Sequence, residues 1–153
     1  MSLESLATVL SDGRHGPAPT IAASAYVAAA IELMHDHDVD ALIAMNGNRI
    51  AGVFTTRDIV AGVLVSRRDV ACTRLSDVLR QPAISLPADA NAFEALRCMD
   101  DCGCHHVAVD RRDHLPCILS RRDLTDWIIR RQQEQLDCAI GAVRQMGFTN
   151  RRG

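Results

Sequence analysis

The sequence predicts an α/β fold of the α+β kind, built from two similar halves that pack sheet to sheet. The stretch GVFTTRD at 52–58 returns as CILSRRD at 117–123, 65 positions later. The residues before both stretches agree in character at the same shift, without a gap, over about 40 positions. One half has too few strands to cover its own apolar faces, whereas two halves packed together would bury them.

Each element of the first half is predicted by its pattern. The short β-leaning segment TIAA at 20–23 indicates a strand, and apolar residues recur at helical spacing over 27–34. ALIAM at 41–45 and IAGVF at 50–54 indicate two buried strands, which the Asn-Gly of the turn between them joins as a hairpin. TTRDIVAGVLV at 55–65 then predicts a helix, so the unit is strand–helix–strand–strand–helix.

The second half repeats this order. Asn91 and Glu94 stand three residues apart before an apolar run, which predicts a capping box at the start of its first helix. Its strands are expected at 83–87, 106–110 and 115–119, its turn at 111–114, and its helices at 92–99 and 120–131.

Additional helices are expected at both ends. The first carries Leu3, Leu6, Val9 and Leu10 and is predicted to pack on the second repeat. The last carries an apolar stripe, which we expect to dock on its own module or on a dimer mate. The alternative is that the stripe passes the ligand signal to another protein. The stripe is Leu136, Ala139, Ile140, Val143 and Met146. The predicted parts are 1–70 (first repeat with the N-terminal helix), 71–131 (second repeat) and 132–153 (C-terminal helix and tail).

Composition excludes several classes of protein. The net charge is −2 and all 17 basic residues are Arg without a basic block, which argues against a nucleic-acid binder. No run approaches the ~20 apolar residues of a membrane span, and the N-terminus carries Glu4 without a basic region, which argues against a secretory signal. Six cysteines are too few for a dense disulfide framework in this length, so we expect reduced thiols and a cytoplasmic protein.

The two heptapeptides and the element order before each resemble the CBS domain, named after cystathionine β-synthase, in its tandem form, the Bateman module. The heptapeptides match the family's small–apolar–apolar–Thr/Ser–x–x–Asp ending, and the likeness covers about residues 3–130. The resemblance implies a non-catalytic regulatory module that binds an adenosyl ligand between its repeats: AMP, ADP, ATP, S-adenosylmethionine or NAD. It also implies a homodimer, and an effector protein would receive the signal.

The resemblance implies particular ligand-binding residues by position. For ribose and phosphate these are Thr55, Arg57, Asp58, Ser120, Arg122 and Asp123. For the base it implies the first and second strands of each repeat, at Thr20, Ile21, Leu42, Ile84, Ser85 and Val107. A phosphate could in addition be attracted by the imidazoles of His105 and His106.

The hydroxyl–x–x–carboxylate spacing has two physical interpretations. A Thr or Ser where a helix begins, with an acid three residues later, forms a cap that contributes about 0.5–2 kcal/mol. The same helix start offers N–H groups to a phosphate, and an ionised Asp accepts hydrogen bonds from two vicinal ribose hydroxyls. The two roles can coexist at Thr55 and Asp58, and at Ser120 and Asp123.

The two clefts are expected to be unequal. Asp40 before the second strand of the first repeat would repel a phosphate, whereas His105 or His106 at the matching place would attract one. Cys117 stands where the first motif has Gly52 and is expected to narrow the second cleft. The His pair favours the cleft that it lines and Gly52 favours the first motif, so the choice between the two stays open.

Other clusters have ordinary explanations beside functional ones. Cys98, Cys102 and Cys104, followed by the His pair, are expected as core-filling thiols, with a redox or metal sensor as the alternative. His and Asp residues at 35–40 are typical of a helix end, with a cation site as the alternative. No catalytic constellation stands out, so we expect no enzyme and no metal. A scaffold that acts only through dimerisation is the competing function.

Overall fold

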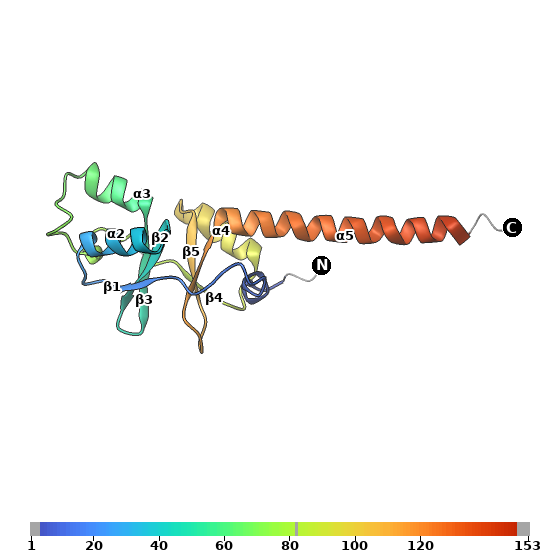
Figure 1. Ribbon diagram of the computed structural model, residues 1–153, viewed down its shortest axis with the longest axis horizontal. Helices are drawn as coiled ribbons and strands as arrows, with labels where there is room; N and C mark the ends of the chain where they lie inside the picture. The colour runs from blue at the N-terminus through green and yellow to red at the C-terminus, as the bar shows by residue number, and fades with distance from the viewer. Residues whose placement is uncertain (1–3, 82, 150–153) are drawn as a thin grey trace. The chain divides into compact units, whose positions relative to one another are not determined.

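The computed structural model describes residues 4–81 and 83–149 and comprises two compact units (Figure 1). The larger unit ends at Arg121, and the smaller unit begins at Arg122. The larger unit contains all six strands and therefore both predicted sheets. Within the described residues, no helix is both long enough and apolar enough to cross a membrane.

The first repeat has the predicted order of elements. Its sheet runs β1-β2-β3, with β1 parallel to β2 and β2 antiparallel to β3. The hairpin turns at Gly47, whose φ of +62° is a left-handed conformation that glycine adopts at little cost. The elements are β1 (Thr20–Ala22), α2 (Val27–Asp36), β2 (Ala41–Asn46), β3 (Arg49–Thr55), α3 (Thr56–Ile59) and a π-helical continuation (Val60–Leu64).

The second repeat has the same topology. Its sheet runs β4-β5-β6, again with one parallel and one antiparallel pairing. The predicted capping box is confirmed, because Glu94 N–H donates to Asn91 Oδ1 and Asn91 N–H donates to Glu94 Oε2, each at 2.9 Å. The elements are β4 (Ser85–Pro87), α4 (Ala92–Cys102), β5 (His106–Asp110), β6 (Cys117–Ser120) and α5 (Arg121–Thr149).

The two sheets pack against each other within the larger unit, where β3 contacts β5 and β2 contacts β6. Strand β2 is buried along most of its length, as a strand covered on both faces must be. The predicted fold of two similar repeats packed sheet to sheet is therefore confirmed.

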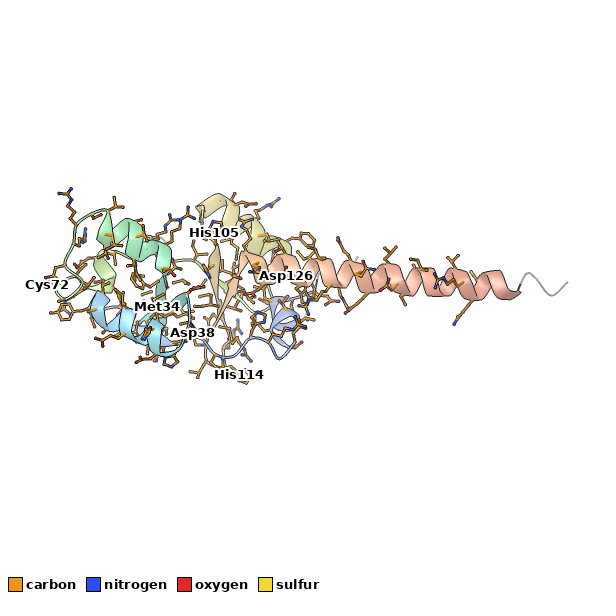
Figure 2. All side chains as sticks on the ribbon, turned by 45° about the horizontal axis from the view of Figure 1, so that its top comes forward. Met34, Asp38, Cys72, His105, His114 and Asp126 are labelled. Atoms are coloured by element: carbon orange, nitrogen blue, oxygen red, sulfur yellow. The ribbon has the colours of Figure 1, made fainter. Side chains whose placement is uncertain are left out.

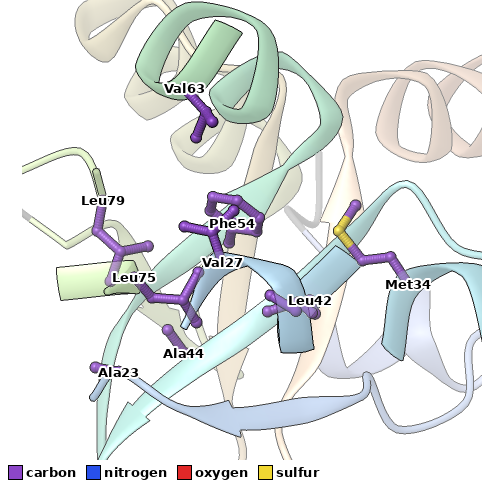
Figure 3. Packing of buried hydrophobic residues seen from close by; sticks show 10 residues of the cluster. Ala23, Val27, Met34, Leu42, Ala44, Phe54, Val63, Leu75 and Leu79 are labelled. Atoms are coloured by element: carbon purple, nitrogen blue, oxygen red, sulfur yellow. The ribbon is translucent and has the colours of Figure 1, made fainter. Parts of the chain in front are cut away.

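The core of the first repeat is largely aliphatic, with Phe54 as its largest side chain (Figure 3). Leu75 and Leu79 come from the segment that links the two repeats, and both are buried in this same core. A Cβ placed on Gly52 would meet Leu79 Cδ2 at 3.5 Å, so the linker lies directly against β3. Burying a side chain of this size contributes roughly 1.5–3 kcal/mol, which anchors the linker where it leaves the first repeat.

The N-terminal helix α1 (Leu6–Leu10) packs on the second repeat, as predicted. The N–H of Leu6 donates to Ala90 O at 2.7 Å and that of Ala7 to Ala88 O at 2.9 Å. Leu6, Val9 and Leu10 are buried, whereas Leu3 lies outside the described residues.

Helix α5 runs without interruption over 29 residues and supplies the smaller unit. The helix predicted after the second motif and the predicted C-terminal helix are therefore one helix. Its apolar stripe is exposed at Leu136, Ile140, Val143 and Met146. What covers this stripe stays a prediction.

Candidate functional site

One cavity of the larger unit has a volume of about 410 Å³ and is lined by both repeats. The first repeat contributes the end of β3 and the start of α3, and the second contributes the turn between α4 and β5. Figure 2 labels His105 on this turn. The lining residues are Asp40, Val53, Thr55, Thr56, Arg57, Asp58, Arg80, Ile84, Gly103, Cys104, His105 and His106.

The first hydroxyl–x–x–carboxylate motif forms a complete capping box. Thr55 ends β3 in an extended conformation and precedes the first turn of α3. Its N–H donates to Asp58 Oδ2 at 2.9 Å and its hydroxyl donates to the same oxygen at 3.1 Å. The N–H of Asp58 donates to Thr55 Oγ1 at 3.3 Å. The capping role predicted for this pair is therefore confirmed. Asp58 is 9% exposed, and these hydrogen bonds hold its buried carboxylate in one orientation.

Arg80 connects this motif to the second repeat. Its Nε lies 4.0 Å from Asp58 Oδ1, and its Nη1 donates to the carbonyl oxygens of Gly103 at 3.1 Å and Cys102 at 3.4 Å. The buried Leu79 directly precedes Arg80 and fixes where its side chain starts. Sequence reasoning missed Arg80, because nothing in the linker distinguishes it from the other arginines there.

The α4–β5 turn forms the opposite wall. Gly103 ends α4 with φ +62°, and the N–H of Cys104 donates to Met99 O at 3.0 Å. Burial raises the pKa of the Cys104 thiol, and the nearby Cys102 adds to this rise. A backbone hydrogen bond at His106 and the charge of Arg80 oppose the rise. The thiol therefore remains mainly protonated at neutral pH.

The cavity brings together six of the residues predicted to bind ligand: Thr55, Arg57, Asp58, Ile84, His105 and His106. Five residues predicted to hold the base do not line it. Leu42 and Val107 are fully buried in their strands, Ile21 packs partly buried against the first core, and Thr20 and Ser85 are exposed. Ligand contact by these five stays a prediction.

The second motif spans the boundary between the two units. Ser120 is the last residue of β6, and Arg122 and Asp123 lie in the first turn of α5. The boundary falls between Arg121 and Arg122. Ligand contact at Ser120, Arg122 and Asp123 therefore stays a prediction.

The His pair lies beside the first motif, and which of the two clefts binds a ligand stays open. His105 and His106 line the same cavity as Thr55 and Asp58, and so does Asp40. The cause is the packing of β3 against β5, which brings the end of one strand near the start of the other. The Asp and His side chains that the sequence assigned to different clefts thus line one cavity.

The Gly52 and Cys117 positions differ in their surroundings. Gly52 faces Leu79, whereas Cys117 is fully buried and its Sγ accepts a hydrogen bond from Arg111 Nη1 at 3.4 Å. Neither residue lines the cavity of the first motif. Narrowing of a second cleft by Cys117 stays a prediction.

The metal alternatives gain no support from the described part of the chain. Within it, no group of three or more His, Cys, Asp or Glu side chains is placed to hold a metal ion. In the cluster at 35–40, His37 Nδ1 lies 3.0 Å from Leu33 O, an interaction within one helix end.

A second cavity of the larger unit, of about 520 Å³, lies at the β5–β6 turn beside α1. Both acidic and basic side chains line it, among them Asp89, Asp110, Arg111, Arg112 and Asp113. It contains no residue of either motif, so its side chains offer controls for experiments on the first cavity.

Comparison with known proteins gives one family. The sequence model of the family described as "CBS domain" matches residues 14–65 and 75–130. The CBS domain-containing protein CBSX3, mitochondrial, of Arabidopsis thaliana is 23% identical over 124 residues, or 78% of this chain. The chain spans 60% of the length of that relative.

Solved structures agree with this fold. A putative signal-transduction protein with CBS domains from Burkholderia ambifaria MC40-6 matches with a TM-score of 0.70 and 23% identity, covering 83% of this chain and 95% of the other. The CBS domain protein PAE2072 from Pyrobaculum aerophilum, solved in complex with AMP, matches with a TM-score of 0.65 and 18% identity. That match covers 78% of this chain and 89% of the other.

Proposed function

The chain belongs to the CBS domain family, and on that premise we propose that its larger unit binds an adenine nucleotide or a related adenosyl compound as a non-catalytic regulatory module. One observation carries the proposal: the cavity of the first motif joins the Thr55–Asp58 pair to Arg80 and the His pair of the second repeat. Its volume of about 410 Å³ falls within the usual range of small-molecule sites, ~300–1,000 Å³.

The ribose is assigned to Asp58. Its Oδ2 already accepts from the N–H and the hydroxyl of Thr55, whereas its Oδ1 lies 4.0 Å from Arg80 Nε, beyond hydrogen-bond distance. Oδ1 is therefore the oxygen that accepts from a ribose hydroxyl. Because the carboxylate is held by the cap, binding costs little side-chain entropy. A hydrogen bond to a charged group contributes about 1.5–3 kcal/mol.

The phosphate is assigned to the cationic side of the cavity. Arg57 and Arg80 supply two guanidinium groups, and His105 and His106 supply ring nitrogens as further donors. Asp40 and Asp58 supply two carboxylates, which oppose a highly charged ligand. Among the phosphate-bearing candidates, the balance favours AMP or NAD over ATP.

The apolar part of the cavity accommodates the base. Ile84 and Val53 come from different repeats and both line the cavity. An aliphatic pair of this kind can cover the two faces of a flat ring, and backbone groups at strand edges can read its polar edge. Binding would therefore require both repeats, which couples the ligand to their relative arrangement.

Thermal unfolding with AMP, ADP, ATP, S-adenosylmethionine and NAD tests the proposal. At about 100 times Kd, a ligand of the folded state adds about 2.7 kcal/mol of stability, or a rise in Tm of roughly 5–10 °C. The matched variants are Asp58→Asn in the cavity and Asp113→Asn outside it. We expect the rise to be lost in the first and kept in the second. No rise from any of the five compounds would favour the scaffold function.

The scaffold alternative is supported by one observation of its own. Val60, Leu64 and Val65 are 51%, 64% and 74% exposed at the end of the first repeat's last helix. A second copy that covers this surface would give the homodimer expected for such a module. Sedimentation velocity tests it: Leu64→Asp should dissociate the dimer, whereas Leu136→Asp on α5 should not. The opposite pattern would assign the dimer to α5.

A cytoplasmic location and an effector protein complete the proposal. Six free cysteines fit a compartment that keeps thiols reduced. Cell fractionation tests the cytoplasmic location.

An effector protein that responds to the bound nucleotide would receive the signal from the exposed stripe of α5, which includes Leu136 and Ile140. The test is nucleotide-dependent capture of that effector by the full chain, compared with capture by Leu136→Asp.

A further inference from the structure

Three thiols gather where α4 ends beside the cavity. Cys98 and Cys102 lie one helical turn apart, and Cys104 follows Gly103 and lines the cavity. Burial raises the pKa of the Cys98 thiol, and the nearby Cys102 thiol raises this pKa further. Cys102 is exposed and Cys98 is partly exposed, so an oxidant in solution can reach the pair.

The end of α4 that carries this pair also accepts hydrogen bonds from the Arg80 guanidinium. The carbonyl oxygens of Cys102 and Gly103 both accept from Arg80 Nη1. Asp100 in the same turn pairs with Arg121 Nη2 at 2.6 Å. A change in the shape of this turn therefore acts directly on Arg80, whose other neighbour is Asp58.

Helix geometry makes a disulfide between these thiols a conformational event. Residues four apart in an α-helix have Cα atoms about 6.2 Å apart, inside the 4.4–6.8 Å range of disulfides. Their Cβ atoms are about 5–6 Å apart, whereas a disulfide requires about 3.5–4.5 Å. The bond can therefore close only if the last turn of α4 distorts.

We propose that Cys98 and Cys102 form a reversible disulfide that distorts the end of α4, releases Arg80 from its carbonyl acceptors and thereby reshapes the cavity. The inference is independent of the identity of any nucleotide ligand. It adds a redox input at one wall of the cavity, because two thiols that the ligand proposal does not use act on Arg80, which that proposal assigns to the phosphate.

The oxidant is a hydroperoxide, and the reaction balances. The thiolate of Cys102 attacks the terminal oxygen, the O–O bond breaks, and the leaving alkoxide or hydroxide takes a proton. The sulfenic acid so formed is attacked by the thiolate of Cys98, which forms the S–S bond and displaces hydroxide, protonated to water. Two thiols lose two electrons in total and the hydroperoxide gains them. Dithiothreitol reverses the change.

The test treats the full chain with hydrogen peroxide in the Cys72→Ser/Cys138→Ser background, which removes two of the three exposed thiols and leaves Cys102 as the third. Intact mass should fall by about 2 Da, and peptide mapping should find Cys98 joined to Cys102. Cys98→Ser should abolish the product, whereas Cys104→Ser should retain it. A bond between Cys102 and Cys104, or stable sulfinic acid without a disulfide, would overturn the proposal.

Hydrogen exchange tests the conformational step. The N–H groups of Gly103 and Cys104 donate to Asp100 O and Met99 O and report on the end of α4. We expect their exchange to accelerate about tenfold or more on oxidation, because a distorted turn opens at lower cost. Reduction should restore the slow exchange. A disulfide that forms with unchanged exchange at these amides would refute the switch and leave only an inert bond.

Discussion

Replacing Asp58 by Asn is the perturbation that isolates the charge of the first motif. The side chain keeps its size, and its amide oxygen can still accept the Thr55 N–H that Oδ2 accepts at 2.9 Å. The variant therefore retains most of the cap of α3, and the free energy of unfolding should fall by no more than about 1–2 kcal/mol. What it removes is the carboxylate charge available to a ribose hydroxyl at Oδ1.

The expected loss of affinity follows from that one change. A hydrogen bond to a charged group contributes about 1.5–3 kcal/mol, and an amide recovers part of it. We therefore expect the Kd for AMP to rise by roughly 10- to 100-fold. The variant also loses the ion pair between Arg80 and Asp58. This loss changes the free energy little, because the Arg80 side chain is 52% exposed and a screened pair contributes at most about 1 kcal/mol.

Isothermal titration of AMP into the wild type, Asp58→Asn and Asp113→Asn gives the comparison. Asp113 lines the second cavity and carries the same charge, so its variant controls for net charge. Equal Kd values for all three proteins would refute the assignment of the ribose to Asp58. Equal weakening in both variants would show a long-range charge effect in place of a contact.

Four further outcomes are expected. Arg80→Ala should weaken AMP about tenfold but leave adenosine unchanged in titrations, because only the phosphate needs the guanidinium; equal loss for both would contradict this role. Thr55→Val should lower the free energy of unfolding by about 0.5–2 kcal/mol in urea, since the cap loses its hydroxyl; an unchanged midpoint would show that the cap is unimportant. Phe54→Ala should cost about 3–5 kcal/mol in the same assay, because Phe54 is fully buried; a loss below about 1 kcal/mol would place Phe54 outside a tight core. Cys98 should react with iodoacetamide more slowly at pH 8 than an ordinary thiol of pKa 9.0, and its rate should keep rising to a higher pH. The reason is that burial, and secondly Cys102, raise the pKa of Cys98 and so deplete its thiolate. A rate equal to that of a short cysteine peptide would refute the shift.

The features predicted from sequence are those set by neighbours along the chain. The capping boxes at Thr55–Asp58 and Asn91–Glu94 depend on residues three apart, so their spacing identifies them. The element order depends on periodicity and on the repeat, and the structure has it in both halves.

The features that sequence reasoning missed depend on contacts between distant segments. Arg80 reaches Asp58 only because Leu75 and Leu79 anchor the linker in the first core, which no local pattern reveals. The position of the His pair beside Thr55 follows from the approach of β3 and β5. Spacing alone cannot specify how two sheets meet.

A crystal structure of the full chain grown with AMP tests the central claim most directly. The account predicts nucleotide density in the cavity between the repeats, with ribose hydroxyls within hydrogen-bond distance of Asp58 and the phosphate beside Arg80. Density bound only elsewhere, for example beside Asp123 or at the β5–β6 turn, would contradict it.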